Sequence, residues 1–236
     1  MIEVIPETGS TSTDLLARLA GGENVPEGHW LVADRQVAGR GRQGRAWFDG
    51  SGNFMGSCVV HLRPGDPPAG TLALGAGLAL HEVVAPRIAL PPRAELKWPN
   101  DLMVGRAKLA GILLERAGDA VVVGIGVNLS RAPQVEGRLV ATMADYGPAP
   151  DRDHFANELA ARFAEEVACW RSGGLGPLLS RWAACAHPVG TPLEAGDAGS
   201  EAVQGTFAGL APDGALQLRL ADGTHRVIHA GEVRLS

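Results

Sequence analysis

Four short apolar runs follow one another between residues 95 and 127 at the spacing of antiparallel strands. Short apolar runs bounded by turn residues predict hairpins, and Gly105 and Arg106 form the predicted turn between two of them. This part of the chain is therefore expected to form a sheet of sequence neighbours. The runs cover residues 95–98, 102–104, 109–114 and 120–127, and further strands are expected over residues 2–5, 29–33 and 54–62.

Helices are predicted where apolar residues recur every three or four positions. The clearest covers residues 151–170, and Gly173 and Gly174 end it. Others are expected over residues 72–84, after the N-capping residues 10–13, and over residues 178–186, where Pro188 stops the helix. The apolar stripe of the clearest helix consists of Phe155, Leu159, Phe163, Val167 and Trp170.

The hydrophobic pattern changes after His187. Leu216, Leu218 and Leu220 alternate with other residues, and turn residues such as Asp222 and Gly223 separate the alternating stretches. Alternation between turns predicts a small all-β unit. The chain is thus expected to be an α+β protein with a first domain over residues 1–187 and a second over residues 188–236.

Composition excludes several classes of protein. The net charge of −5 over 236 residues disfavours a chain-wide grip on nucleic acid or an anionic membrane. Three widely spaced cysteines predict no disulfide framework and favour a reducing compartment. The N-terminus lacks the basic region of a signal peptide, and the apolar stretch over residues 71–80 is too short to span a membrane. A soluble, cytoplasmic protein is expected.

A loop rich in glycine and arginine, residues 36–53, separates two of the predicted strands. It contains a G-x-G-x-x-G string, but no helix can begin after its third glycine, so a Rossmann dinucleotide site is rejected. No P-loop motif occurs either. Phosphate binding explains this clustering of positive charge best. A solvated surface loop and an arginine-glycine segment that touches RNA are the alternatives. The clustered arginines are Arg35, Arg40, Arg42 and Arg45.

Only two of the 21 basic residues are lysines, and both lie within residues 93–108. Lysine is a compact point charge, whereas arginine is a planar fork, so a site that needs the former does not accept the latter. Lys97 and Lys108 are therefore candidate functional residues. They begin the strings KWPND and KLAGI, and a third string, GIGVN, ends the last of the four apolar runs. A glycine inside an apolar strand, such as Gly111, suggests close approach by another backbone or a ligand.

Together, GRGRQGRAW, KWPND, KLAGI and GIGVN resemble the biotin protein ligases, and the resemblance extends from Ser10 to Gly231-Glu232-Val233. It implies an ATP-dependent ligase that forms biotinyl-5'-AMP and transfers biotin to a lysine of a biotin carboxyl carrier domain. The implied fold is a mixed β-sheet flanked by helices, similar to class II aminoacyl-tRNA synthetases, followed by a small C-terminal β-barrel. A lipoate or octanoate ligase or transferase of related fold is the alternative function.

The resemblance also implies roles for individual residues. Lys108 bridges the biotin carboxylate and the α-phosphate, and it acts in catalysis with Arg42, Arg45 and Asp101, the last a candidate base. Ser12 is a departure, since relatives commonly carry Asn there, and no Trp occurs over residues 139–142. The biotin-binding residues are expected to be Ser10, Thr11, Ser12, Gln36, Gly39, Arg40, Gly41, Arg42, Lys108 and Gly111; the nucleotide-binding residues are expected to be Arg40, Arg42, Arg45, Trp47, Asn100, Lys108 and Asn128.

The expected partners and cofactors follow from the same resemblance. Mg²⁺ is expected with ATP, held mostly by phosphates and by a carboxylate such as Asp101. His225 and His229 have metal-ligand spacing, but a metal there is disfavoured. No DNA partner is expected, because only nine residues precede Ser10 and leave no room for a helix-turn-helix module. No membrane partner is expected either, because of the net negative charge and the short apolar stretch. A homodimer is an option that the sequence leaves open.

Overall fold

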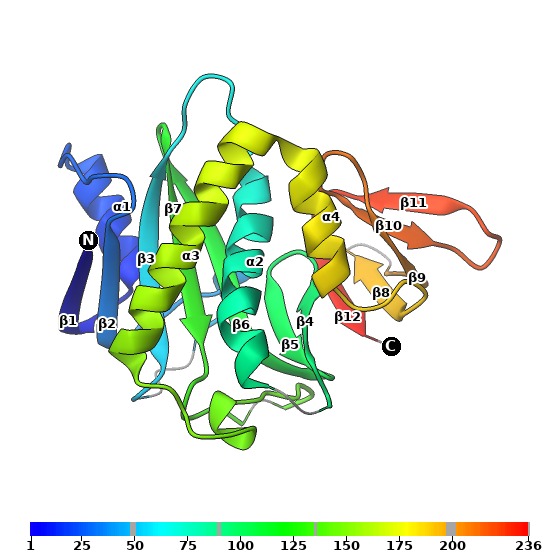
Figure 1. Cartoon of the computed structure of the whole chain (residues 1–236), viewed down its shortest axis with the longest axis horizontal. Helices are drawn as coiled ribbons and strands as arrows, with labels where there is room; N and C mark the ends of the chain where they lie inside the picture. Colours follow the sequence, from blue (N-terminus) through cyan, green and yellow to red (C-terminus); the bar gives the residue numbers. More distant parts are fainter. Residues whose placement is uncertain (48–50, 89–90, 135, 197–201, 236) are drawn as a thin grey trace.

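A seven-stranded mixed sheet forms the centre of the protein (Figure 1). The computed structural model describes residues 1–47, 51–88, 91–134, 136–196 and 202–235. The strand order is β1-β2-β3-β7-β6-β5-β4; β1 and β2 are parallel, and all other pairs are antiparallel. The bounds are Ile2–Thr8 for β1, Trp30–Gln36 for β2, Phe54–His61 for β3, Ala94–Lys97 for β4, Asp101–Val104 for β5, Ala107–Ala117 for β6 and Ala120–Val127 for β7.

The four apolar runs between residues 95 and 127 form the meander β4–β7, which confirms the prediction from their spacing. The largest difference concerns β6, which is longer at both ends than the predicted run 109–114. Its ladder with β7 continues through the charged residues Glu115 and Arg116, which pair with Val122 and Val121. Backbone pairing with a long neighbouring strand therefore extends β6 beyond its apolar residues.

Helices α2 (Leu72–Val84), α3 (Arg152–Gly173) and α4 (Leu175–Cys185) cover one face of this sheet (Figure 1). Trp30 of β2 packs edge-on against Phe163 of α3, with 5.8 Å between ring centroids. The predicted stripe of α3 is buried in this core, from Phe155 to Trp170. Helix α4 begins three residues earlier than predicted, because Pro177 lies in its first turn, where proline is tolerated.

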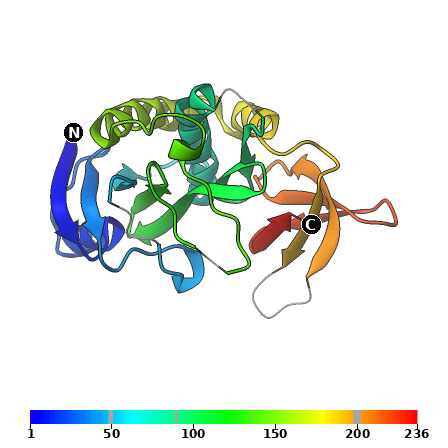
Figure 2. The same cartoon turned by 90° about the horizontal axis from the view of Figure 1, so that it is seen from below.

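Helix α1 (Thr11–Ala20) packs on the opposite face against a smaller core that includes Leu15, Leu31 and Val59. Figure 2 shows α2, α3 and α4 along one side of the sheet, and the segments 40–47 and 130–134 on the other side. The mixed sheet flanked by helices is thus confirmed, and among the described residues one part of its second face is not covered by an α-helix.

One helical stretch, Ala69–Arg87, is long and apolar enough to cross a membrane by length and composition alone. The sequence prediction had counted only residues 71–80; short 3-10 turns at both ends of α2 extend the stretch. Of its most apolar window, 61% is buried inside the protein. Residues such as Leu78 and Leu80 face the core between the sheet and helices α3 and α4, as in the core helix of a globular fold.

A second, five-stranded antiparallel sheet follows α4, as the alternating pattern predicts. Leu216 and Leu218 are fully buried in it. The predicted barrel is not observed: in the described ladders the order is β11-β10-β9-β8-β12, and the outer strands β11 and β12 do not pair with each other. The division of the chain at residue 187 stays a prediction. The bounds are Pro192–Gly196 for β8, Val203–Leu210 for β9, Leu216–Arg219 for β10, His225–Ile228 for β11 and Glu232–Leu235 for β12.

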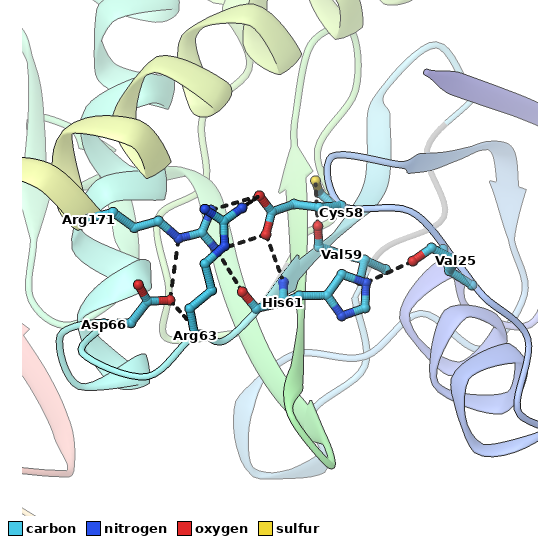
Figure 3. A network of polar contacts seen from close by, with 8 residues as sticks. Val25, Cys58, Val59, His61, Arg63, Asp66 and Arg171 are labelled. Carbon is cyan, nitrogen blue, oxygen red and sulfur yellow. Dashed lines mark hydrogen bonds and ion pairs between the residues drawn. The ribbon is translucent and has the colours of Figure 1, made fainter.

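A polar network at the His61 end of β3 ties α3 to the main sheet (Figure 3). The guanidinium of Arg171 donates to both carboxylate oxygens of Glu27 at 2.7 Å and to the carbonyl of His61 at 2.6 Å. It also donates to Asp66 at 3.3 Å. The hydrogen bonds from Arg171 lower the pKa of Glu27 against the opposing effect of burial. The network anchors the C-terminal half of α3.

Candidate active site

A cavity of about 890 Å³ lies on the face of the main sheet opposite α2, α3 and α4. Strands β3, β5, β6 and β7 form its floor, and the start of α1, the segment 40–47 and strand β12 form its walls. Every predicted site residue except Gly39 lines it, and Gly39 lies against Gln36 and Trp47. The residues brought together are Ser10, Thr11, Ser12, Gln36, Arg40, Gly41, Arg42, Arg45, Trp47, Asn100, Asp101, Lys108, Gly111 and Asn128.

Hydroxyl groups cluster at the N-terminus of α1. Ser10 is the N-cap of this helix, and its side chain accepts a hydrogen bond from the amide of Thr13. Thr11 bonds to Gln36 through its amide nitrogen at 2.7 Å and its hydroxyl at 3.0 Å. Ser57 of β3 lies 2.7 Å from the Thr11 hydroxyl and 2.9 Å from that of Ser12. This end of the cavity is therefore a compact, buried polar pocket.

The segment 40–47 folds back on itself beside this pocket. The Gly41 amide donates to the carbonyl of Arg45 at 2.7 Å, and the Trp47 amide donates to the carbonyl of Gly39 at 2.8 Å. The loop is therefore a closed turn rather than an extended chain. Its arginines contact different walls: Arg40 reaches Thr13 and Glu115, and Arg45 pairs with Glu232 of β12.

Arg42 joins the glycine-arginine segment to the KWPND string. It donates to Oδ1 of Asn100 at 3.0 Å and to the carbonyl of Gly231 at 3.0 Å. The amide nitrogen of Asn100 in turn donates to the carbonyl of Ile112 in β6 at 2.6 Å. Segments that lie far apart in the sequence thus meet around one guanidinium.

Asp101 holds both lysines of the chain. Its Oδ1 lies 2.6 Å from the ammonium of Lys108, and its Oδ2 lies 3.0 Å from that of Lys97. Burial alone raises the pKa of Asp101, but the charges of Lys108 and Lys97 outweigh this effect and hold the pKa below its usual range. A carboxylate with a lowered pKa is a poor proton acceptor, and both of its oxygens already face cations. This arrangement disfavours Asp101 as a general base and does not fit Asp101 as a Mg²⁺ ligand.

Trp47 occupies the part of the floor where two strands carry glycine. A Cβ atom on Gly126 would lie 2.3 Å from the indole, and one on Gly111 would lie 3.1 Å from it. Gly111, the glycine of KLAGI, therefore leaves room for the side chain of Trp47. The sequence analysis predicts close approach by another backbone or a ligand at this position. The ammonium of Lys108 lies 5.7 Å from the indole centroid, within reach of a cation–π interaction. Trp47 is therefore placed on the sheet floor, next to the residues predicted for biotin.

Asn128 closes the far side of the cavity. Its amide nitrogen donates to the carbonyl of Ala141 at 3.1 Å, and its Oδ1 is buried without a partner in the described part of the chain. The segment around Leu139 and Val140 runs beside Lys108, whose backbone bonds to Leu139 and Ala141. Leu139 is 64% exposed, at the place where the sequence lacks a Trp.

The family comparisons agree with this arrangement of motifs. The profile described as "Biotin/lipoate A/B protein ligase family" matches residues 4–129, and the profile described as "Biotin protein ligase C terminal domain" matches residues 194–236. The chain belongs to the biotin protein ligase family. The two matched regions contain most of the seven-stranded sheet and most of the five-stranded sheet.

Individual relatives in the biotin protein ligase family cover nearly the whole chain. The biotin–[acetyl-CoA-carboxylase] ligases of Mycobacterium tuberculosis and Paracoccus denitrificans are each 37% identical over 98% of it, which corresponds to 88% and 98% of their own lengths. The bifunctional ligase/repressor BirA of Escherichia coli is 34% identical over 99% of the chain and 74% of its own length. The biotin protein ligase of Aquifex aeolicus, solved with biotin and ATP, superposes with a TM-score of 0.86 at 25% identity, over 100% of this chain and 99% of that one.

The sequence analysis did not single out every residue of the biotin protein ligase cavity. Ser57 looked like one small residue in an apolar strand, and its contacts with Thr11 and Ser12 link positions 45 or more residues apart. The sequence indicated Glu232 only as part of the resemblance at Gly231-Glu232-Val233, with no role for its side chain. In contrast, the glycines of GIGVN were flagged, and a Cβ atom on Gly124 would lie 2.6 Å from the hydroxyl of Ser12.

A protein-held metal has little support in this member of the biotin protein ligase family. No group of three or more His, Cys, Asp or Glu residues suited to a metal ion occurs among the described residues. His225 lies in β11, and His229 follows that strand and pairs with Asp213 at 3.3 Å. The cations Arg40, Arg42, Arg45 and Lys108 line the cavity and suit it to anions.

Proposed function

We propose that this chain is an ATP-dependent biotin protein ligase that forms biotinyl-5'-AMP and transfers biotin to a lysine of a biotin carboxyl carrier domain. The buried hydroxyl groups of Ser10, Thr11, Ser12 and Ser57 form a hydroxyl pocket at the start of α1. The observation that carries the proposal is that one cavity contains both this hydroxyl pocket and the cations Lys108 and Arg42. The names of the relatives from Mycobacterium tuberculosis and Paracoccus denitrificans support the same reaction.

The first step requires positive charge. The carboxylate of biotin must attack the α-phosphorus of ATP, and the two anions repel each other. Lys108 of β6 contacts Asp101 and lines the same cavity as the hydroxyl pocket and the arginine segment. We expect its ammonium to contact both the biotin carboxylate and an α-phosphate oxygen. Arg40, Arg42 and Arg45 supply the remaining positive charge along the cavity. Preorganised charge of this kind provides most of the catalysis in reactions at phosphorus.

Asp101 is better suited to position the two lysines than to accept a proton. It fixes the direction of Lys108 and Lys97, because each carboxylate oxygen faces one ammonium. Mg²⁺ bound together with ATP would neutralise phosphate charge, and phosphate oxygens and water would be its main ligands.

The second step transfers the acyl group. The mixed anhydride hydrolyses readily, so the site must exclude water until the lysine of the carrier attacks the acyl carbon. Two segments flank the cavity and can cover the intermediate, residues 40–47 and residues 136–140.

The alternative function is the attachment of lipoate or octanoate, which uses the same activation chemistry. Measuring AMP release with biotin, with lipoate, and without either acid distinguishes the two, and we expect biotin-dependent release only. Equal release with lipoate would overturn the proposal. A cytoplasmic location, a homodimer and the absence of DNA binding remain predictions, and a gel shift with duplex DNA at physiological salt tests the last of these.

A further inference from the structure

The hydroxyl pocket contains a chain of hydrogen bonds whose direction is fixed by chemistry. The amide N–H of Thr11 donates to Oε1 of Gln36 at 2.7 Å, so that oxygen is identified as the carbonyl end of the side-chain amide. The hydroxyl of Thr11 lies 3.0 Å from the same oxygen, which can only accept. Both contacts of the Thr11 hydroxyl, to Gln36 and to Ser57, can be hydrogen bonds at the same time only if Thr11 gives its single proton to Gln36.

The remaining two bonds follow in order. Ser57 lies 2.7 Å from the hydroxyl oxygen of Thr11, and because Thr11 has no proton left to give, Ser57 donates to it. Ser12 lies 2.9 Å from Ser57, whose proton is now used, so Ser12 donates to Ser57. All of these side chains are buried, so each hydroxyl finds its nearest partners within the pocket. Ser12 is left able only to accept.

The accepting oxygen of Ser12 is placed on the floor of the cavity. It lies against the bare Cα of Gly124, where a Cβ atom would approach it to 2.6 Å. Gly124 pairs with Ser57 across the β3–β7 ladder. In this cross-strand pair, Ser57 contacts the Ser12 hydroxyl, and Gly124 leaves the space that this hydroxyl occupies. A buried acceptor at this position favours a ligand that presents an N–H group.

We propose that Ser57 is a positioning residue for biotin. It accepts the proton of Ser12 and so holds the Ser12 oxygen as a hydrogen-bond acceptor for a ureido N–H of biotin. The inference rests on the proposed function and goes beyond it by naming the source of acid specificity. Lipoate and octanoate carry no N–H group, so they would leave the buried Ser12 oxygen without a partner. Ser57 itself does not need to touch the ligand.

The test is pyrophosphate exchange with Ser57→Ala, with biotin varied at saturating ATP. Without the Ser57 oxygen, Ser12 can rotate its proton toward the ligand and loses its fixed accepting role. We expect the KM for biotin to rise about tenfold, the range of one or two lost hydrogen bonds, while kcat and the KM for ATP stay within about twofold. A general structural defect would change all three parameters.

Two further variants make the comparison specific. Thr71→Val removes a buried hydroxyl that bonds to Trp170 and Pro68, so it should lower the melting temperature without changing the KM for biotin. In a Ser12→Ala background, adding Ser57→Ala should raise the KM for biotin by less than twofold, because the residue through which Ser57 acts is gone. If Ser57→Ala does not fold, Ser57→Cys, which keeps the shape with a weaker donor, serves in the same assays.

The outcomes separate this inference from the proposed function. Folded Ser57→Ala with a KM for biotin within twofold of wild type would overturn the role of Ser57 and leave the ligase activity intact. Full additivity of Ser12→Ala and Ser57→Ala would overturn it as well. Wild-type protein without biotin-dependent exchange would overturn the proposed function itself.

Discussion

The ammonium of Lys108 lies 2.6 Å from a carboxylate oxygen of Asp101. This contact places the lysine of KLAGI against the aspartate of KWPND, across the β5–β6 ladder. Lys108 is still 31% exposed toward the cavity, so it can reach an anionic ligand without leaving its strand. A charge that is anchored on one side and open on the other is well placed to stabilise a reaction between two anions.

Lys108→Arg should reduce adenylate formation about 100-fold, although the charge is kept. A guanidinium is wider than an ammonium and would separate the biotin carboxylate from the α-phosphate, and a displacement of about 1 Å can cost that much in rate. Pyrophosphate exchange measures the effect, and thermal unfolding checks the fold. Lys97→Arg is the matched control, and its effect should be smaller. A folded Lys108→Arg protein within about threefold of wild type, or ~0.7 kcal/mol, would exclude the assigned role.

Asp101→Asn should lower the free energy of unfolding by roughly 2–4 kcal/mol, because it leaves two partly buried ammonium groups without their anion. The side chain of Asp101 is 13% exposed, so water compensates little. Urea unfolding at pH 7 measures the change. Asp119→Asn is the control: this side chain is 96% exposed, and its removal should change the stability by less than about 0.5 kcal/mol. Equal effects of the two substitutions would contradict the expectation.

The contribution of Asp101 should also depend on pH. Its pKa in the folded protein lies below the ordinary value of 3.8, so the unfolded chain binds this proton more readily. The stabilisation is therefore complete above about pH 4 and is lost as the pH falls through the folded pKa. Urea unfolding from pH 7 to pH 3 should show wild type and Asp101→Asn converging at the acid end. A gap that stays constant below pH 4 would show that the pKa is not lowered.

Gly126→Ala should reduce pyrophosphate exchange at least tenfold while the protein stays folded. The added Cβ atom would lie 2.3 Å from the indole of Trp47, so the tryptophan must leave the sheet floor. Gly147→Ala is the control, because a Cβ atom there meets nothing within 4 Å. Exchange and melting temperature are measured together. Normal exchange by Gly126→Ala would show that the position of Trp47 does not matter for activation.

The glycine-arginine segment should become protected when ligands bind. We predict this for residues 36–51, of which residues 48–50 lie outside the described part of the chain. Ordering glycine-rich backbone costs entropy, which contacts with biotin and ATP would offset. Hydrogen exchange with and without both ligands measures it, and peptides from α3 serve as the internal control. Equal protection of the segment in the two states would argue against a role in covering the site.

Local pattern was sufficient to predict most of the secondary structure. The continuous apolar run over residues 120–127 predicts β7, which is buried along almost its whole length. The stripe from Phe155 to Trp170 predicts α3, because the side-chain period and the burial agree there. Short polar extensions of strands, such as Glu115 and Arg116 of β6, were not predicted. Backbone pairing with β7, and not an apolar side-chain pattern, keeps these residues in the strand. The predicted closure of the C-terminal sheet came from the resemblance, since alternation reports which face is buried but not which strands pair.

The site shows the same limit. Its charged members could be found because KWPND, KLAGI and the arginine segment carry residues that are costly to bury. Ser57 could not, because a single serine in an apolar strand gains meaning only when β3 brings it to Thr11 and Ser12. The pairing of both lysines with Asp101 is likewise tertiary, as it depends on the register between β5 and β6.

Strand β12 shows what else the cations of this molecule do. Arg42, Lys97 and Arg106 donate to the carbonyls of Gly231, Val233 and Leu235. Gly231 directly precedes β12, and these alternate carbonyls point to one edge. This is the outer edge of the five-stranded sheet, since β12 pairs only with β8 among the described strands. An open edge of this kind is a template for another chain and for aggregation. Here side-chain charge blocks it, so the residues that prepare the cavity for anions also keep the protein from adding a foreign strand.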